Sequence, residues 1–361
     1  MPSLAQLRDL IVSPGVEVSG GMDVLDLDRS FIEDVSGVLR AASVGRDVDA
    51  QVHGRLTCEV ARDLDWPRVL LAPHMTLTSA SLSHRFDLGV YVPQIPERPA
   101  GETPATFTVE ADDILARVNV PHLDSVEVDE ATEVLAKVRE LLDAAGLDHS
   151  LDSSADGKTF DDPKVWPWSE QASTLEICNE LLDAIGYRRL WADQSGRVRS
   201  QEAVPAADRA VEWVYDVSDQ RQSIVLDRSR SAPARRAPNR WVFTVGDPMR
   251  VAIEEDDGIY TRNNLDDGPT SQDARGGWII ATQVDVDVVD QESLVRKGDE
   301  HVERALRDAD QVTAETGPQP LTWHRTVVRL LDPVLGDSKR LVTSWSLDVL
   351  SGAMSQQWRR A

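Results

Sequence analysis

The sequence is short of positive charge. Lysine and arginine together number 38 against 62 aspartate and glutamate residues, which leaves a formal net charge of −24. Binding to nucleic acid or to an anionic membrane depends on clustered cations that neutralise phosphates. The composition therefore argues against both functions for the chain as a whole. Only five of the basic residues are lysine, a bias typical of coding sequences of high G+C content.

Cysteine is almost absent. The two cysteines, Cys58 and Cys178, lie far apart, which predicts reduced, buried thiols rather than a disulfide framework. Each falls among the apolar positions of its predicted strand or helix, so neither is expected to be reactive. The sequence has no HExxH, CxxC or GxSxG motif, and no two of its seven histidines are three or four residues apart. We therefore expect no metal, no cofactor and no catalytic residue.

Long hydrophobic runs are also missing. The longest apolar stretches, such as RVLLAP and GWIIAT, are far shorter than the roughly 20 residues that span a membrane. The N-terminal sequence MPSLAQLRDLIVSPG mixes acidic and polar residues with apolar ones and has no continuous signal-peptide core. We expect a chain that is synthesised in a cytoplasm and stays soluble.

Alternation of apolar and polar residues dominates residues 19–112. In QVHGRLTCEV, every second residue from Val52 to Val60 is small or apolar, as a half-buried strand requires. Three further segments, around 75–81, 86–92 and 105–109, show the same pattern with turn residues between them. Several short strands at this spacing predict a small β-barrel or sandwich.

The period changes after residue 112. In SVEVDEATEVLAKVRELLDAAGLD, apolar residues within 134–145 share one face of a helix, and Gly146 is placed to stop it. A second helix is predicted in STLEICNELLDAIG, where Ser173 and Glu176 match a capping box. The sequence YRRLWADQSGRVRS then predicts a β-hairpin that turns at 193–196. Together these patterns predict an α/β module inserted between regions of β structure.

The predicted fold class is mainly β with α+β inserts. Strand-like alternation returns in AVEWVYDV and again from about residue 241, and a helical stretch precedes the last strands. A chain of 361 residues exceeds a usual single core, so two or three domains are expected. We predict two β-barrel domains, each interrupted by a smaller module. The predicted segments are an N-terminal helix or arm (1–18), a first barrel with its linker (19–112 and 205–240), an α/β insert (113–204), a second barrel (241–288 and 320–361) and a helical insert (289–319).

Two groups of residues are candidates for contacts with other protein chains. The basic cluster lies in the proline- and serine-rich connector DRSRSAPARRAPNR, without the interleaved aromatics of a nucleic-acid site. Ten tryptophans are many for a chain with few other aromatics, and core or subunit contacts are their usual roles. Two of them stand in the short motif WPW after a polar loop. The candidate contact residues are Arg228, Arg230, Arg235, Arg236, Trp166 and Trp168.

Acidic pairs such as Asp256/Asp257 and Asp285/Asp287 leave an alternative open. A glycosidase uses two carboxylates on either side of the bond that it cleaves. However, 62 acidic residues supply such pairs by chance, and no DxDxDG spacing of a calcium loop occurs. A glycan hydrolase that uses an Asp/Glu pair stays the alternative function, and a calcium site is left open.

The order of several stretches resembles one protein family. The helix and hairpin of TLEICNELLDAIGYRRLWADQSGRVRSQ are similar to a recurrent segment of bacteriophage tail-hub proteins. These are the baseplate-hub-like minor tail proteins found in phages of high-G+C Gram-positive hosts. The stretch VHGRLTCEVARDLDWPRVLLAPHMTL resembles their first-barrel strands, NRWVFTVGDP the entry to the second barrel, and LVTSWSLDVLSGAM the last strands. The resemblance covers most of residues 19–355.

The resemblance implies a structural virion protein at the tail tip of a siphophage. The core of this family has no catalytic residues, so the chain is expected not to be an enzyme. The family implies a homotrimeric ring whose six barrels meet the sixfold tail tube, with genome DNA passing through without specific binding. Its expected partners are the distal tail protein ring, the C-terminus of the tape-measure protein and the tip or receptor-binding proteins. The chain would be synthesised in the host bacterial cytoplasm without membrane insertion. A distal tail or spike-like protein is the structural alternative.

Overall fold

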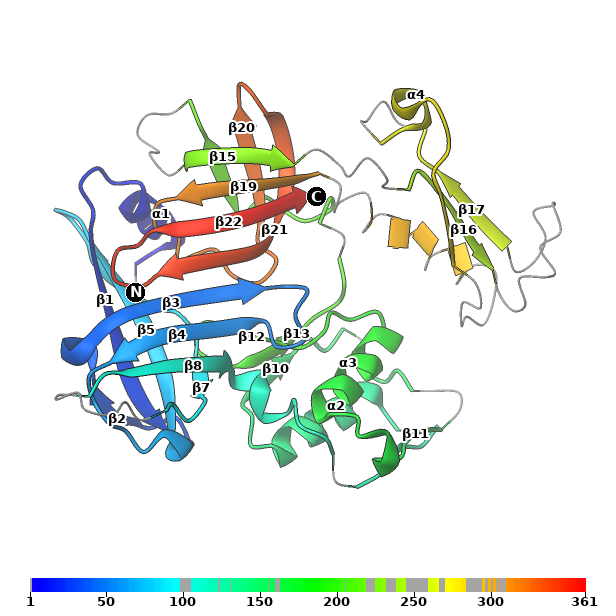
Figure 1. Ribbon diagram of the computed structural model, residues 1–361. Helices are drawn as coiled ribbons and strands as arrows, with labels where there is room; N and C mark the ends of the chain where they lie inside the picture. The colour runs from blue at the N-terminus through cyan, green and yellow to red at the C-terminus, as the bar shows by residue number, and fades with distance from the viewer. Residues whose placement is uncertain are drawn as a thin grey trace. The chain divides into compact units, whose positions relative to one another are not determined.

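The computed structural model gives the chain two compact units, each described by itself (Figure 1). The first unit comprises Met1–Asp227 and Ala314–Gln356, and the second comprises Arg228–Thr313 and Gln357–Ala361. The residues that the structure describes are 2–97, 105–122, 124–130, 132–154, 156–159, 163–204, 206–218, 225–231, 238–244, 259–265, 270–283, 294–295, 298–299, 301–302, 305 and 310–361.

Most of the described strands belong to one large, curled sheet, which confirms the prediction of a mainly β fold with helical inserts (Figure 1). Its strands are β1 (Glu17–Asp26), β2 (Phe31–Asp34), β3 (Leu39–Asp47), β4 (Gly54–Val60), β5 (Val69–Thr78), β6 (Ser83–Asp87), β7 (Tyr91–Pro93), β8 (Phe107–Asp113), β14 (Trp213–Asp216), β15 (Val225–Ser231), β19 (Gln311–Thr316), β20 (Val327–Asp332), β21 (Gly336–Asp348) and β22 (Met354–Arg360). Within the described residues the main order is β15-β19-β22-β21-β3-β4-β8-β7-β5-β1-β2. Strand β6 pairs with β5, β20 pairs with β21, and β14 pairs with β20.

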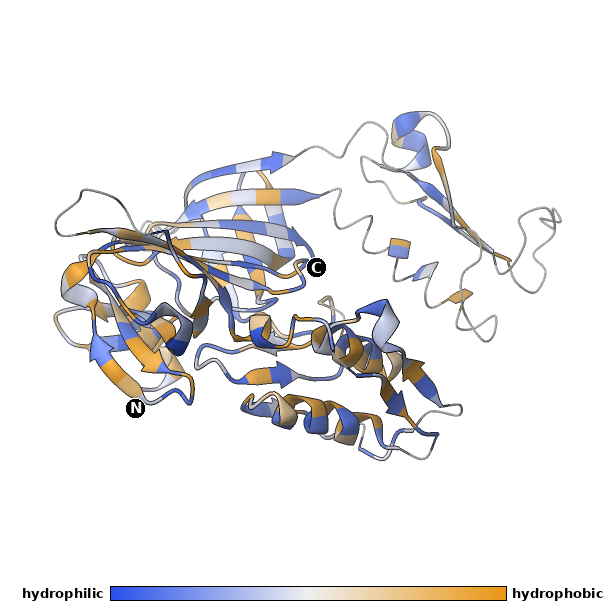
Figure 2. Cartoon of the chain, turned by 60° about the horizontal axis from the view of Figure 1, so that its bottom comes forward, coloured by the Kyte–Doolittle hydropathy of each residue, from blue (hydrophilic) through white to orange (hydrophobic). Residues whose placement is uncertain are grey.

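The alternation seen in the sequence decides which side chains enter the core. Along β4, Leu56, Cys58 and Val60 are buried while the residues between them are exposed, as the sequence predicts. Figure 2 shows hydrophobic and hydrophilic residues following one another along the strands of the sheet. Gly20 in β1 is required by a close approach, because a Cβ atom there would lie 2.2 Å from the carbonyl oxygen of Val349.

Strands from the two ends of the sequence are continuous in this sheet. Strand β3 pairs with β21 in an antiparallel ladder in which Val44 lies opposite Leu347. Residues of the predicted first and second barrels therefore share one hydrogen-bonded sheet. The proposed partition into 19–112 with 205–240 and 241–288 with 320–361 stays a prediction.

Helix α1 (Leu4–Ile11) starts the chain, as the sequence predicts. Its N-cap is Ser3, whose hydroxyl accepts a hydrogen bond from the Gln6 N–H in a capping box. Leu10 and Ile11 at its end are buried. Short 3-10 turns occur at η1 (Ser36–Val38), η2 (Trp66–Arg68), η3 (Ile114–Arg117) and η4 (Trp168–Glu170).

The middle of the chain forms the predicted α/β module. Its helices, α2 (Val134–Ala144) and α3 (Thr174–Ala184), lie side by side around buried residues that include Leu142 and Leu182 (Figure 1). Gly146 ends α2 in the left-handed conformation, and the predicted hairpin turns at Asp193–Gly196. Two small sheets complete the module: β9 (Val126–Val128) pairs with β11 (Lys164–Trp166), and β13 (Val198–Ser200) lies between β10 (His149–Leu151) and β12 (Trp191–Ala192).

The second unit contains a small sheet of its own. Strand β16 (Arg240–Thr244) lies between β17 (Ile259–Asn263) and β18 (Ile280–Gln283), and α4 (Gln272–Arg275) is a single helical turn. Trp241, Phe243, Leu294 and Val302 form its described core. The predicted strand residues 284–288 and much of the predicted helical insert lie outside the described residues, and β19 begins at Gln311.

Candidate functional site: a tryptophan hollow and a buried arginine cluster

The two tryptophans of the WPW motif have different environments. Trp166, the last residue of β11, is buried, and its indole Nε1–H donates to Glu180 Oε2 at 2.7 Å. Trp168, the first residue of η4, leaves 67% of its surface exposed. Its backbone N–H donates to Ser125 Oγ at 3.3 Å, which holds the main chain while the ring faces solvent. Trp166 is therefore a structural anchor, and Trp168 is the ring available to a partner.

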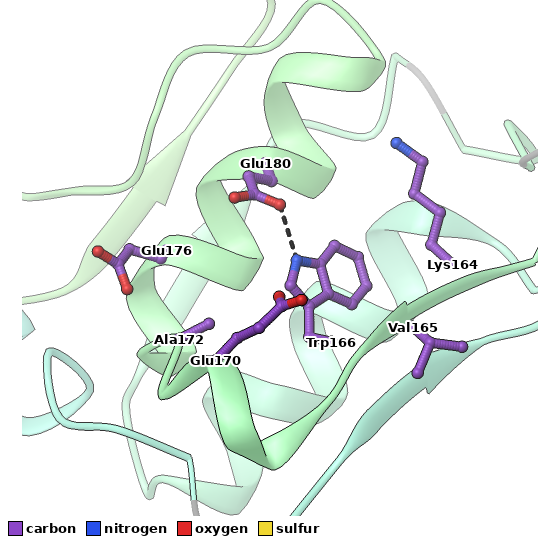
Figure 3. A pocket seen from close by; sticks show the side chains of 7 residues that line it. All are labelled: Lys164, Val165, Trp166, Glu170, Ala172, Glu176 and Glu180. Atoms are coloured by element: carbon purple, nitrogen blue, oxygen red, sulfur yellow. Dashed lines mark hydrogen bonds between the residues drawn. The ribbon is translucent and has the colours of Figure 1, made fainter.

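A hollow of about 450 Å³ opens beside Trp166 (Figure 3). Its lining residues are Lys164, Val165, Trp166, Glu170, Ala172, Glu176 and Glu180. In Figure 3 the carboxylates of Glu170 and Glu180 both lie near the nitrogen-bearing edge of the indole, while Lys164 projects away from the ring. The hollow thus combines an aromatic wall with an excess of negative charge, a surface suited to contact with a protein.

Helix α3 presents this acidic face because of its own sequence. Leu175, Cys178 and Leu182 face the core, so Glu176 and Glu180, four residues apart, share the outer face. At the first turn, Ser173 Oγ accepts from the Glu176 N–H at 3.1 Å, and Glu176 Oε2 accepts from the Ser173 N–H at 2.8 Å. The hydrogen bond from the Ser173 backbone lowers the pKa of Glu176. This carboxylate therefore stays charged at the mouth of the hollow.

The predicted arginine group is only partly described. Arg228 and Arg230 lie on β15, and the guanidinium of Arg230 forms a two-pronged ion pair with Asp310, with distances of 2.8 and 3.0 Å. Arg235 and Arg236 lie outside the described residues. Arg230 thus already has a carboxylate partner in its own unit. The tryptophans belong to the first unit and these arginines to the second, and their role as contact residues stays a prediction.

A buried arginine in the first unit is a site that the sequence analysis missed. Arg46 in β3 is only 4% exposed, and its Nη2 donates to the carbonyl of Ala192 at 2.6 Å and lies 3.7 Å from Asp113 Oδ2. Its guanidinium also covers the ring of Trp323, 4.6 Å from the ring centroid. Trp323 Nε1 donates to the same Ala192 carbonyl at 2.9 Å. Arg46 therefore ties the large sheet to the hairpin of the α/β module.

Two main-chain N–H groups hold the carboxylate of Asp113, and one of them comes from β4, the strand between β3 and β8. Its Oδ2 accepts from the Gly54 N–H at 2.8 Å, and its Oδ1 accepts from the Leu115 N–H at 3.0 Å. Gly54 lies opposite Arg46 in the ladder of β3 and β4. A Cβ atom at Gly54 would lie 2.9 Å from the Asp113 side chain, so this position has room only for glycine.

Two histidines complete this group, which we call the Arg46 cluster: Arg46, His53, Asp113, Trp191, Trp323 and His324. The rings of His53 and His324 lie 4.7 Å apart between centroids, and His324 stacks on Trp191 at 5.2 Å. Both ring nitrogens of His53 face carbonyl oxygens, Nδ1 that of Asp47 at 3.1 Å and Nε2 that of Leu190 at 3.2 Å. A neutral ring can donate to only one of these carbonyls.

The surroundings of the two histidines disfavour their charged forms. Burial, with the nearby charge of Arg46, lowers the pKa of His53 to about 4. Burial also lowers the pKa of His324 well below its usual range, and His53, Arg46, Arg325 and Arg188 add to this effect. Both rings are therefore neutral at physiological pH. Protonation of either ring in acid adds a positive charge close to that of Arg46.

Both cysteines lie in the core. Cys58 and Cys178 are buried free thiols, and burial raises the pKa of each to about 12. In the described part of the chain, no three histidine, cysteine, aspartate or glutamate side chains gather as metal ligands. No helix there is long and apolar enough to cross a membrane. What the described residues do present is an exposed tryptophan near an acidic hollow, and a buried polar cluster inside the first unit.

Comparison with solved structures places this fold among phage tail proteins. No protein-family model and no curated protein matches the sequence. The tail protein from Neisseria meningitidis MC58 matches with a TM-score of 0.66 and 9% identity, covering 95% of this chain and 97% of that one. The 43 kDa tail protein of prophage MuSo2 from Shewanella oneidensis matches with a TM-score of 0.61 and 13% identity, covering 95% and 98%. The prophage tail protein gp18 from Listeria monocytogenes EGD-e matches with a TM-score of 0.55 and 10% identity, covering 94% of each chain.

At these identities the likeness shows the fold alone, and that fold is the one of phage tail proteins. The family resemblance seen in the sequence is supported at this coarser level. The more specific expectation, a phage of a high-G+C Gram-positive host, stays a prediction.

Proposed function

We propose that this chain is a structural protein of a phage tail and serves as the hub of the tail tip. The observation that carries the proposal is the fold, which matches a tail protein over 95% of this chain and 97% of the other with a TM-score of 0.66. The chain is accordingly proposed to act by assembly rather than by chemistry.

In this proposal three copies form a closed ring that joins the tail tube to the distal tip and its receptor-binding apparatus. The support is the order of motifs in the sequence, which resembles tail-hub proteins from the first β region to the last strands. The ring would bind the distal tail protein, the C-terminus of the tape-measure protein and the tip proteins. Its location is the tail tip of the virion, after synthesis in the host cytoplasm.

The α/β module supplies the contact surface in this proposal. Trp168 exposes most of its ring, and the hollow beside Trp166 carries Glu170, Glu176 and Glu180 at its edge. Exposed aromatic rings are enriched where proteins meet. Arg228, Arg230, Arg235 and Arg236 remain proposed contact residues, but the Asp310 partner of Arg230 makes Trp168 the better first target.

Passage of DNA agrees with the charge of the chain. A net charge of −24 per copy repels a phosphate backbone at distances within a Debye length, roughly 8 Å at physiological salt. DNA would therefore slide through such a ring instead of binding to it. No cofactor or metal has a part in this function.

The proposal is tested by locating the chain in tails. Tail particles isolated from cells that express an affinity-tagged copy are labelled with gold beads against the tag and imaged. The proposal expects beads at one end of the tail, opposite the capsid. Labelling along the tube, or tails that lack the chain, would contradict it.

A further inference from the structure

A narrow groove runs between helix α1 and strand β14 in the first unit. It is a hollow of about 250 Å³, smaller than the roughly 300–1,000 Å³ of pockets for small organic ligands. Arg8 and Val12 line it from the helix side, and Val211, Trp213 and Val214 line it from the strand side. Val214 leaves 39% of its surface exposed. The groove is thus open to solvent and mostly apolar on the strand side.

Strand β14 pairs with a neighbour on one side only in the described part of the chain. That neighbour is β20, and the two strands run parallel. The N–H of Val217 donates to the carbonyl of Leu331 at 3.0 Å. Because main-chain groups alternate in direction along a strand, the N–H and C=O of Val214 point away from β20 and toward the groove.

One main-chain group at this edge already has a partner from outside the strand. Glu212 precedes β14 and interrupts the alternation, because its N–H donates to the Val327 carbonyl at 2.8 Å. Its C=O accepts a hydrogen bond from Arg8 Nη2 at 2.6 Å. The side chain of Arg8 thus crosses the groove at one end and leaves the edge at Val214 uncovered.

Trp213, which also lines the groove, carries a buried indole donor. Trp213 is only 8% exposed, and its indole Nε1–H has no acceptor among the described residues. A buried donor without an acceptor destabilises the folded chain. The open edge of β14 can pair with a ligand that presents carbonyl oxygens and N–H groups in regular order, which is an extended peptide.

We propose that this groove binds an extended segment of a different tail protein, which adds to the edge of β14 as a further strand. Main-chain pairing at Val214 holds the segment, and an apolar side chain contacts Val211. Helix α1 walls the groove on its far side, so a lone segment enters where the edge of a second copy's sheet does not fit. The inference rests on the proposed function, because it takes the partner from the assembled tail.

The test uses photo-crosslinking in assembled tails. Val211 is replaced by p-benzoylphenylalanine in the full chain, and Val334, in the exposed turn between β20 and β21, is replaced in a matched control. Tails are irradiated, and the crosslinked peptides are identified by mass spectrometry. We expect position 211 to crosslink to one segment of a different tail protein, whereas position 334 does not reach that segment.

Hydrogen exchange and a proline variant complete the test. The Val214 amide should exchange at least about 100-fold more slowly in tails than in the free chain. Val214→Pro removes only an N–H that points away from β20, so the free variant should fold while the crosslink from position 211 is lost. Tails that contain the chain but show no crosslink at 211, a crosslink only to a second copy, or unchanged exchange at Val214 overturn the inference. Absence of the chain from tails would instead overturn the proposed function.

Discussion

Acid should weaken the first unit through His53 and His324. A histidine with its usual pKa of about 6.5 takes up a proton in the unfolded chain as the pH falls below that value. In the folded chain the pKa of His53 is lowered to about 4 and that of His324 is lowered well below its usual range, both first of all by burial. Well above pH 6.5 both rings are neutral in the folded and the unfolded chain, so neither makes the free energy of unfolding depend on pH. Below pH 6.5 the unfolded chain binds a proton at each ring while the folded chain does not. The free energy of unfolding therefore falls with pH until the pH reaches the pKa of the folded state.

The size of the effect follows from the difference between the two pKa values. One pH unit corresponds to about 1.4 kcal/mol for each proton taken up only on unfolding. Between pH 7 and pH 5 His53 should therefore cost about 2 kcal/mol, and His324 should add to this loss. For His53 the loss should level off near pH 4, where the folded state begins to take the proton. Against a typical total stability of about 5–15 kcal/mol, this is a large loss.

The assay is urea unfolding of the full chain at several pH values between 7.5 and 4.5, followed by near-UV circular dichroism. Carboxylates also titrate in this range, so the informative quantity is the difference between wild type and variants. The double variant His53→Asn with His324→Phe cannot take up the two protons. Its free energy of unfolding should fall by at least about 2 kcal/mol less than that of wild type between pH 7 and pH 5. The control His84→Asn changes a half-buried histidine of β6 outside the cluster.

Parallel loss of stability in wild type and double variant would refute this reasoning. It would mean that the two rings are protonated in the folded chain, with His53 donating to both carbonyls that face it. A smaller slope in His84→Asn as well would show that the effect does not belong to the Arg46 cluster.

Four further outcomes are expected. Arg46→Ala should lower the free energy of unfolding by about 3–5 kcal/mol in a urea titration at pH 7, because it leaves the Asp113 charge buried with one partner fewer. The double variant Arg46→Met with Asp113→Asn should recover part of that loss, because it removes both charges. Trp166→Phe should cost roughly 1 kcal/mol in the same titration through loss of the indole hydrogen bond to its glutamate partner. Trp168→Ala should leave the melting temperature of the free chain nearly unchanged but reduce ring formation, measured by light scattering during size-exclusion chromatography, and equal ring formation would remove Trp168 from the contact surface. The purified chain should release no product from cell-wall glycan, and a chelator should leave its melting temperature unchanged; turnover abolished by one Asp→Asn or Glu→Gln change would establish the hydrolase alternative instead.

Local signals in the sequence predict much of the module that carries Trp166 and Trp168. The capping box of Ser173 and Glu176, the glycine that ends α2 and the turn at Asp193–Gly196 all depend on residues within a few positions of one another. Such contacts form wherever the local sequence favours them. The structure therefore reproduces both helices and the hairpin of this module.

The Arg46 cluster shows why the rest could not be predicted. Its members come from four separate parts of the chain, near residues 46–53, 113, 191 and 323–324. Only the pairing of β3, β4 and β8, and the hydrogen bonds of Arg46 and Trp323 to the hairpin, bring them together. One signal was nevertheless present. Arg46 follows Ala42 and Val44 on the buried face of β3, and Asp113 occupies the corresponding face at the end of β8. Charged residues of opposite sign among buried positions indicate a buried pair, although not the histidines that join it.

The pairing of β3 with β21 is equally inaccessible to local reasoning. The alternation in each strand predicts which face is buried but does not identify the neighbouring strand. Likewise, the sequence WPW does not distinguish the buried Trp166 from the exposed Trp168, because Trp166 is held by a hydrogen bond to Glu180 of the distant helix α3.

An electron-microscopy map of an intact tail that contains this chain tests the central claim most directly. The chain should fit the density at the tail tip as three copies in one closed ring, with Trp168 of each copy buried against a neighbouring protein. A tail tip built without this chain, or a map in which it forms a dimer or a six-copy ring, would contradict the account.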